Sequence, residues 1–313
     1  MVTSQAAGAL PSTPLATSSR TVVTYPTVGC LVAAESMSGV GADRQWESVN
    51  DQQAIFLERF FTSGRSEVQG LAEISSIASW NVEDVNRFLR ERGFTIQLPS
   101  LSARAFAAAS ALDLVLRWTG TRTMIASTNT TTGAEPEELR MFPAVRLGDE
   151  MVRFSRVPGH LQAIATIHTQ SDDQVHMTVM DDPPESFELV DLAVRLSRTR
   201  EATNEFEGVV FPMVSLDHKV DMDWLVGLKT SGDSGFPVGV ASALQQTRFR
   251  MNELGARVES AVAVGITMGV GRVPPLLIID KPFLIWIERA GLSRPLFVGF
   301  IGTDDWKDPG SLF

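Results

Sequence analysis

Hydrophobic and polar positions alternate over much of the chain with the two-residue period of β-strands. In RAFAAASALDLVLRW (104–118) the large apolar residues share one face and Asp113 and Arg117 lie opposite, which predicts a long central strand. The apolar set is Phe106, Leu112, Leu114, Leu116 and Trp118. Three short strands are predicted within 150–180, and others at 208–216, 243–252, 274–280, 283–289 and 295–302. The last two are apolar on both faces and predict adjacent core strands.

Two segments carry helix signals instead. Residues 27–42 are small, apolar and nearly uncharged, and predict a buried helix that Gly41 ends. Residues 81–92 predict an amphipathic helix with Asn81 as its N-cap and Gly93 as its stop. Helices among so many strands predict an α+β fold with large antiparallel or mixed sheets. We expect a single domain over 21–313, after a disordered leader over 1–20.

The segment 258–271 combines the features of a strand with those of a loop. From Ser260 to Gly271 no residue is charged, and large apolar residues alternate with small ones. The large residues are Val258, Val262, Val264, Ile266, Met268 and Val270. This period predicts a strand with one large-residue face, whereas the glycines of the other face are costly in a strand and natural in a loop.

Composition and charge narrow the classes of function. The chain has 313 residues, is 44% hydrophobic and carries a formal net charge of −10, which argues against a nucleic-acid or anionic-membrane partner. No stretch reaches transmembrane length and no signal peptide is recognisable, so we expect a cytoplasmic protein. Cys30 is the single cysteine, which excludes an intramolecular disulfide, and its apolar helix predicts an inert core residue.

The strongest catalytic phrase is GDSGFP (232–237). It resembles the nucleophile loop of chymotrypsin-like proteases, in which Ser234 would lie beside two backbone N–H donors. Such a site needs a histidine, and neither His160 nor His168 has the small-residue context of that family. Glycine, aspartate and serine are also ordinary turn residues, so a loop is the favoured interpretation and a Ser234 hydrolase the weaker one.

Two histidines and two aspartates raise the question of a metal site. His168 and His176 flank Asp172 and Asp173, but zinc ligands are usually paired more closely, and the acids are expected to form a solvated turn between strands. No phosphate-binding loop, dinucleotide fingerprint or pair of catalytic carboxylates occurs. The sequence therefore predicts no metal, no cofactor and no persuasive enzyme site.

Five segments resemble, in family order, parts of the serpins, the serine protease inhibitors. NELGARVESAVAV (252–264) is similar to the serpin hinge, with Glu253, Gly255 and Ala256 at its first, third and fourth places. DKPFLIWIERAGLSRPLFVGFI (280–301) resembles the terminal signature of the family. The less specific matches are VVFPMVSL (209–216), SALDLVLRW (110–118) and TYPTVGCLVAAESMSGVGA (24–42).

The resemblance implies a serpin-like α+β fold, with a large mixed main sheet and a second sheet or barrel. It also implies a reactive loop over about 256–275, which a target protease cleaves and which then inserts into the main sheet. Trp118 would lie at the breach, where the loop enters. The hinge would comprise Glu253, Gly255, Ala256 and Val258, the inserting face Ser260, Val262, Val264 and Ile266, and the cleavage region Met268, Gly269, Gly271, Arg272 and Val273.

The sequence also departs from the serpin pattern. The stretch between the two predicted helices is shorter than in the family, which predicts a trimmed main sheet. Tyr25 and Val28 stand where serpins place paired serines, and Gln245 where many have a buried histidine. Two functions follow: a monomeric inhibitor of a serine or cysteine protease, or a non-inhibitory serpin-fold protein that binds a small ligand or is recruited to another chemistry. A permanent strand at 256–275 is the alternative to an inserting loop.

Overall fold

The largest sheet is antiparallel and has seven strands. The computed structural model describes residues 20–37, 40, 45–101, 106–119, 122–128, 141–232, 237–254 and 275–312, with the backbone alone for 122–128 and Met141. The sheet has the order β1-β18-β17-β9-β8-β7-β10. Its strands are β1 (Arg20–Val22), β7 (Val152–Val157), β8 (His160–His168), β9 (Gln174–Val179), β10 (Glu201–Thr203), β17 (Phe283–Glu288) and β18 (Phe297–Ile301).

The hairpin predicted from 283–302 lies inside this sheet, between β1 and β9. Strands β17 and β18 pair antiparallel with Trp286 opposite Val298, and β9 flanks β17 on its other edge. Every residue from Phe283 to Ile287 and from Phe297 to Ile301 is buried, because α5 (Phe187–Arg198) and the rest of the core cover the faces. The predicted hairpin and the three strands within 150–180 are confirmed. Since β1 includes Arg20, the fold begins within the predicted leader.

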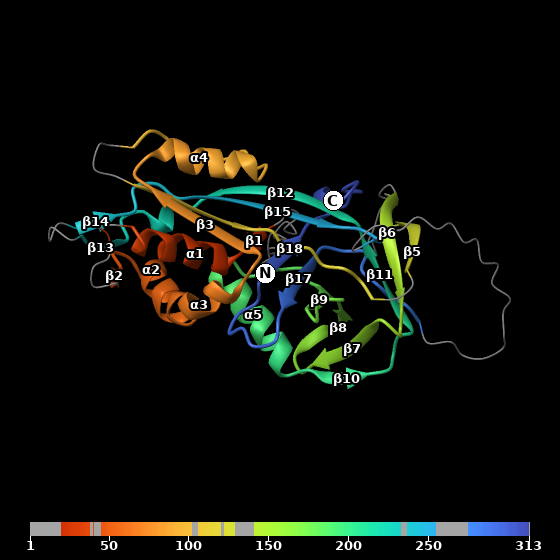
Figure 1. Cartoon of the computed structure of the whole chain (residues 1–313). Coiled ribbons are helices and arrows are strands. Elements are labelled where there is room, and N and C mark those ends of the chain that lie inside the picture. Colours follow the sequence, from red (N-terminus) through yellow and green to blue (C-terminus); the bar gives the residue numbers. More distant parts are fainter. Residues whose placement is uncertain are drawn as a thin grey trace, which may run out of the picture.

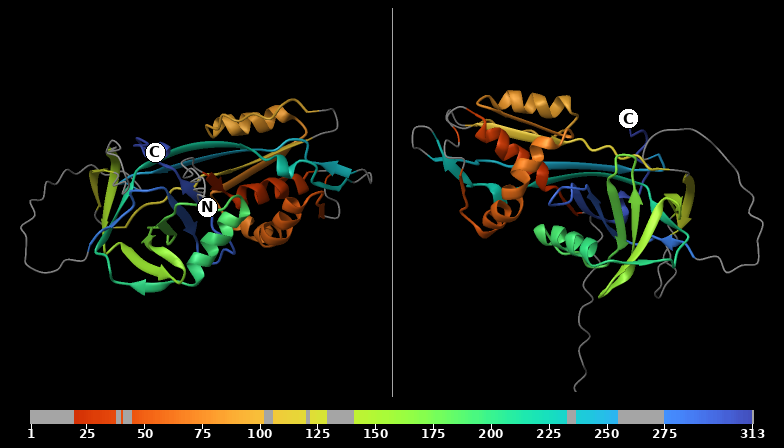
Figure 2. Two further views of the ribbon diagram at one scale, coloured as in Figure 1. Left: turned by 180° about the vertical axis from the view of Figure 1, so that it is seen from behind. Right: turned by 60° about the horizontal axis from the view of Figure 1, so that its bottom comes forward.

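Two strand pairs lie side by side under the helix α4 (Figures 1 and 2). One is β3 (Ile74–Ser79) with β4 (Ala107–Leu112), and the other is β12 (Val214–Asp221) with β15 (Leu244–Met251); both are antiparallel. The predicted strand over 104–118 is therefore wrong in length, because the ladder with β3 ends at Leu112. The strand predicted over 208–216 is found as two strands, because Gly208–Pro212 belongs to one sheet and the chain from Val214 onward to another, with Met213 between them.

A four-stranded sheet at one end of the molecule contains a parallel pair of strands, β11 and β16. Its order is β16-β11-β6-β5, and its strands are β5 (Arg122–Thr128), β6 (Met141–Gly148), β11 (Gly208–Pro212) and β16 (Leu277–Ile278). Strands β11 and β16 run parallel, so the mixed sheet is this one and not the largest. Of the strand predicted over 274–280, only Leu277–Ile278 forms a ladder. A small sheet joins β2 (Trp46–Glu47), β13 (Lys229–Ser231) and β14 (Pro237–Gly239).

The helices confirm one prediction and correct the other. Helix α4 (Val82–Glu91) begins with Asn81, whose side chain accepts from Glu83 N, and stops before Gly93 at φ +75°. Helix α1 (Thr24–Glu35) ends well before Gly41, because the Ser36 hydroxyl donates to the Val32 carbonyl and the chain turns there. No helix was predicted for α5, nor for α2 (Asp51–Phe56), the π-helix η1 (Leu57–Phe61), α3 (Thr62–Glu67) and η2 (Val68–Gly70). Two further short helices are η3 (Asp223–Leu225) and η4 (Thr303–Asp305).

The pair β3–β4 lies between two helices (Figure 1). On one face α4 packs its apolar side chains against the alanines of β4. On the other face α1 packs against both strands, and a Cβ placed on Gly29 would come within 2.7 Å of Ser76 Oγ and 2.8 Å of Ser110 Oγ. Over the described residues, no helix combines the length and apolarity that crossing a membrane requires.

Candidate functional site

The first wall of the site consists of β4 and the extended chain that follows it, residues 107–118. From Asp113 to Arg117 exposed side chains alternate with half-buried ones, and Trp118 is buried, so the alternation has the period that the sequence predicts. This stretch is fastened at its ends: Asp113 N donates to Glu73 O at 2.9 Å, and Gln170 N donates to Arg117 O at 2.8 Å. Between these points, Leu114–Leu116 forms no ladder with any strand that the structure describes.

The second wall is β15. One of its edges pairs with β12 along its whole length, from Leu244 opposite Asp221 to Met251 opposite Val214. Its other edge has no partner strand among the described residues. Phe249 anchors this wall to the core, since its ring stacks on Phe297 of β18 with centroids 4.8 Å apart.

A cavity of about 950 Å³ lies between the two walls. Helix α1 forms its floor with Thr27, Cys30 and Leu31, and Phe297 of β18 also lines it. Burial raises the pKa of the Cys30 thiol to about 12, which keeps this thiol protonated at neutral pH. The side chain is half-buried and lines the cavity, so the predicted place in the core is wrong. The cavity is thus a space between two strand edges that apolar and polar side chains line together, among them Leu114, Gln246 and Arg248.

The chain after α4, residues 92–98, covers the cavity and is tied to the second wall. Gln246 Oε1 accepts from Thr95 N at 2.8 Å and from Ile96 N at 3.2 Å, while its Nε2 donates to Asp217 at 2.6 Å. Arg248 Nη2 donates to the Arg92 carbonyl at 3.0 Å. These bonds satisfy the buried Gln246 and tie the cover to this wall, while Phe94 and Ile96 pack against the apolar cluster of α4 and β4.

At one end of the cavity a hydrogen bond joins the two walls. Trp118 Nε1 donates to the backbone carbonyl of Asn252 at 3.0 Å, and the indole packs edge-on against Phe211 with centroids 6.2 Å apart. Trp118 is 3% exposed. Asn252 directly follows β15, so the walls meet where the chain leaves the sheet for residues 255–274.

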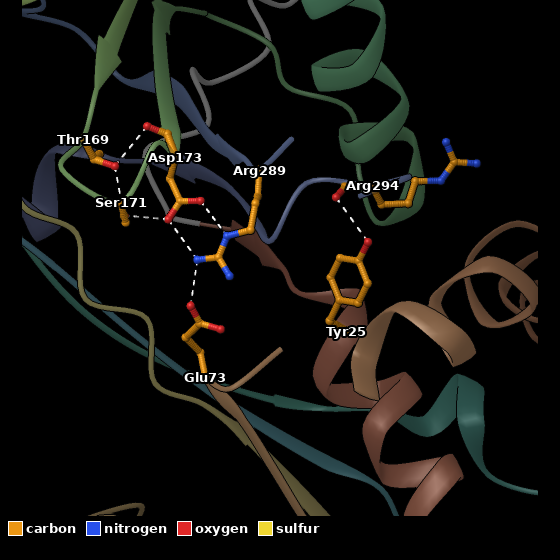
Figure 3. Close-up of polar contacts among 7 residues, drawn as sticks. All are labelled: Tyr25, Glu73, Thr169, Ser171, Asp173, Arg289 and Arg294. Atoms are coloured by element: carbon orange, nitrogen blue, oxygen red, sulfur yellow. Dashed lines mark hydrogen bonds and ion pairs between the residues drawn. The ribbon is translucent and has the colours of Figure 1, made fainter. Parts of the chain in front are cut away.

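An ion cluster fastens the start of the first wall to the large sheet (Figure 3). Arg289 follows β17 and donates to both carboxylate oxygens of Asp173, at 2.7 and 3.0 Å, and to Glu73 Oε1 at 2.7 Å. The hydrogen bond from Arg289 lowers the pKa of Glu73 below its ordinary value. The two acids do lie in the turn between β8 and β9, and Asp172 is exposed as expected. The expectation is wrong for Asp173, which is fully buried, because a guanidinium replaces water around its carboxylate.

A tyrosine fastens the floor of the cavity to its surroundings (Figure 3). The hydroxyl of Tyr25 in α1 donates to Glu67 Oε2 at 2.5 Å and lies 3.5 Å from the carbonyl of Arg294. Burial, together with the neighbouring Glu67 carboxylate, raises the pKa of Tyr25 above its ordinary value. Because this phenol takes the place of a serine in the serpin pattern, it adds a tie between α1 and α3 that a serine is too short to make.

Known proteins match this chain in fold but not in sequence. No family model matches the sequence, and no curated protein matches it either. Solved structures do match the fold. A serpin from Schistosoma mansoni gives a TM-score of 0.57 at 9% identity, covering 90% of this chain and 95% of that one. Serpin48 of the insect Tenebrio molitor gives a TM-score of 0.53 at 12% identity, covering 90% and 91%. The chain has the serpin fold. Human thyroxine-binding globulin in complex with its hormone gives 0.56 at 9%, covering 91% and 92%.

Within this serpin fold, few of the predicted site residues are described. Trp118 is buried at the junction of the two walls, and Glu253 lies half-buried in the turn after β15. Ser234 lies outside the described residues, between β13 and β14, which pair with Ser231 opposite Pro237. Also outside them lie Gly255, Ala256, Val258, Ser260, Val262, Val264, Ile266, Met268, Gly269, Gly271, Arg272 and Val273.

His176, which was considered as a metal ligand, has other side chains as partners at both ring nitrogens. Its Nδ1 accepts from Arg200 Nη1 at 3.1 Å, and its Nε2 lies 3.1 Å from Glu288 Oε2. Burial lowers the pKa of His176, so the ring is neutral and donates from Nε2 to this carboxylate. Both ring nitrogens are therefore used within the serpin core.

Three residues of the site escaped sequence reasoning. Asn252, Gln246 and Arg289 each bond segments that lie far apart in the chain. No spacing or motif identifies them, because a polar residue next to a strand is predicted to be exposed as long as its partners are unknown. For Arg289 a signal was present, since the charged pair Glu288 and Arg289 directly follows the apolar run 283–287 and suggests that buried polar partners lie nearby.

Proposed function

We propose that the chain is a serpin-type trap for a serine or cysteine protease, with segment 256–275 as bait. After cleavage, the segment would insert as a strand between the two walls. The observation that supports this is the cavity of about 950 Å³ between the first wall and β15, since the chain passes into the bait segment directly from the end of β15. Trapping would use the energy of insertion, so the chain needs no catalytic residue of its own.

The two walls offer what an entering strand requires. The free edge of β15 and the unladdered stretch Leu114–Leu116 carry backbone N–H and C=O groups, which an inserted strand would pair. The alternation of the bait segment supplies the matching pattern, because its large apolar side chains would face the floor of the cavity. Burial would contribute roughly 1.5–3 kcal/mol for each of Val258, Val262, Val264 and Ile266.

The bait sequence restricts the target proteases without selecting one. Cleavage between Met268 and Gly269 would suit a chymotrypsin-like protease, and cleavage between Arg272 and Val273 a trypsin-like one. A panel of both classes, incubated with the protein and analysed for an SDS-stable adduct, tests trapping directly. We expect an adduct with at least one class.

Insertion has a test that needs no knowledge of the target. Limited proteolysis near Gly269 is expected to raise the melting temperature sharply, because the freed strand then buries its apolar face. Val262→Glu would place a carboxylate in the cavity, at a cost of several kcal/mol without a partner. We expect this variant to fold normally and to lose the rise in melting temperature, whereas the matched change Ala263→Glu on the other face keeps most of it.

Two results would contradict the mechanism. A wild-type protein that shows no rise after cleavage has no inserting strand. A Val262→Glu protein that is already destabilised before cleavage has a permanent strand at this position, and the alternation of 258–271 is then that of an ordinary core strand.

Binding of a small apolar ligand is the second candidate. The volume of the cavity is within the range of about 300–1,000 Å³ that is usual for ligand pockets. One solved structure of similar fold holds thyroxine. Thyroxine and a fluorescent hydrophobic dye are suitable probes, and Leu116→Trp would fill the cavity while Leu161→Trp, on a residue 87% exposed, would not. Equal binding by all three proteins, or binding by none, contradicts this candidate.

A further inference from the structure

The chain that follows β18, residues 302–312, runs from the core to the junction of the two walls. It starts with η4 and is then anchored by Trp306, which is 7% exposed. The indole of Trp306 packs against Phe142 at 4.7 Å and Phe283 at 6.4 Å between ring centroids. This anchor belongs to the core, so the residues after it need not contribute to folding.

Beyond the anchor, the segment 308–312 meets the site at two points. Asp308 Oδ1 accepts from Gly310 N at 2.8 Å, which closes a turn with Gly310 at φ +70°. This turn presents the carbonyl of Gly310 to Asn252, whose Nδ2 donates to it at 3.1 Å. Leu312 then lines the cavity between the walls.

Asn252 joins three parts of the chain at this junction. Its side chain is bonded on both sides, with Nδ2 donating to Gly310 O and Oδ1 accepting from Leu254 N at 2.9 Å. Its backbone carbonyl accepts the indole N–H of Trp118 on the first wall. With 2% of its surface exposed, the residue has little access to water as an alternative partner.

We propose that segment 308–312 is a strap that holds the junction of the two walls closed and so slows insertion. The inference rests on the proposed function. A strand that enters between the walls from the end of β15 must first separate Trp118 from Asn252. The strap opposes this step in two ways, because it fixes the Asn252 side chain and because Leu312 occupies the end of the cavity.

The strap is suited to opening first. Asp308, Gly310 and Ser311 are exposed, so the segment buries little apolar surface of its own. Segments with few buried contacts open at low free energy, well before the core does. A contact of this kind changes how fast the walls separate and leaves the fold of the walls unchanged.

Three proteins test the strap. A chain that ends after Lys307 keeps the Trp306 anchor and loses the strap, and a chain that ends after Leu312 keeps every described contact and is its control. Asn252→Asp keeps the acceptor for Leu254 N and loses the donor to Gly310 O. The probe is a fluorescent synthetic peptide with the sequence ARVESAVAVGITM (256–268), whose uptake into the uncleaved protein is followed by anisotropy.

We expect the chain that ends after Lys307 to take up the peptide about three to ten times faster than its control, the range that loss of one buried hydrogen bond implies. Hydrogen exchange at Leu254 N–H is expected to accelerate in parallel. Asn252→Asp is expected to take up the peptide as fast as the shortened chain does, since it also loses the bond to Gly310 O; if this variant fails to fold, the shortened chain decides alone.

The outcomes separate the strap from the proposed function. Equal or slower uptake by the shortened chain, when its control takes up the peptide, overturns the strap and leaves the protease trap standing. Unchanged exchange at Leu254 N–H also overturns the strap. If no protein takes up the peptide and cleavage gives no rise in melting temperature, the proposed function is contradicted and the strap with it.

Discussion

Removing Arg289 is a direct test of how the first wall is held. In Arg289→Met the guanidinium disappears while the volume of the side chain is roughly kept. Asp173, which is fully buried, then loses both of its charged donors and keeps only the hydroxyl of Ser171 at 3.0 Å. Glu73 loses its donor as well, and its Oε2 already has no partner among the described residues.

The expected loss of stability follows from this geometry. Breaking a buried ion pair by removing one partner typically costs about 3–5 kcal/mol, because a charge is left buried without compensation. The side chain of Arg289 is 24% exposed, so water can reach the vacated space and reduce this cost. We therefore expect a decrease of about 2–4 kcal/mol in the free energy of unfolding at pH 7.

Urea denaturation followed by tryptophan fluorescence measures this loss. The matched control is Arg156→Met, since the ion pair of Arg156 with Glu205 has side chains that are 41% and 50% exposed, and such a pair is worth at most about 1 kcal/mol. The double variant Arg289→Met with Asp173→Asn is expected to recover part of the loss, because it removes the buried charge. A loss below about 1 kcal/mol for Arg289→Met, equal to that of the control, would refute the reasoning.

The same cluster predicts a pH dependence with a definite sign. The pKa of Glu73 is lowered in the folded state, so its contribution is present above the unfolded value of 4.5 and is lost as the pH falls through the folded value. The stability of the wild type should therefore approach that of Arg289→Met only as the pH is lowered below 4.5. A gap that stays constant as the pH falls from this value through the acid range would contradict this assignment.

Two further predictions concern the floor of the site and the large sheet. Gly29→Ala is expected to lower stability by about 1–3 kcal/mol in thermal unfolding, because the new Cβ would meet Ser76 and Ser110 at under 3.0 Å, whereas Gly70→Ala meets nothing within 4 Å and should be nearly neutral. Because burial lowers the pKa of His176 below 6.5, the unfolded chain binds a proton that the native state does not, so stability should fall below that pH by up to about 1.4 kcal/mol per unit. His176→Gln should make this slope shallower, and an unchanged slope would count against the assignment.

The sequence predicted those elements whose signals are local. The hairpin β17–β18 followed from two runs that are apolar on both faces, and α4 from an N-cap, an apolar stripe and a glycine stop. The helical stretch 51–70 was missed, because a π-helix and a short 3₁₀ turn interrupt the period that a search for amphipathic helices needs.

The polar contacts of the site could not be predicted in the same way. The bond between Trp118 and Asn252 joins residues 134 positions apart, and that between Arg289 and Glu73 spans 216. Such pairs depend on how the sheets pack, and no local pattern records them. The burial of Trp118 was predictable from its place at the end of an apolar face, while the acceptor that its indole N–H finds was not.

The failed strand prediction at 113–118 carries the most information about function. The apolar alternation of a strand continues to Trp118, yet the ladder stops at Leu112. Residues 114–116 therefore have the sequence of a paired strand but no ladder partner among the described residues. Sequence rules and structure tend to disagree at functional sites, where a second state must also be accommodated. Residues 258–271 show the complementary mismatch, since they combine the alternation of a strand with the glycines of a loop. One strand that enters between the walls would resolve both mismatches, which is why the two patterns together support insertion more strongly than either does alone.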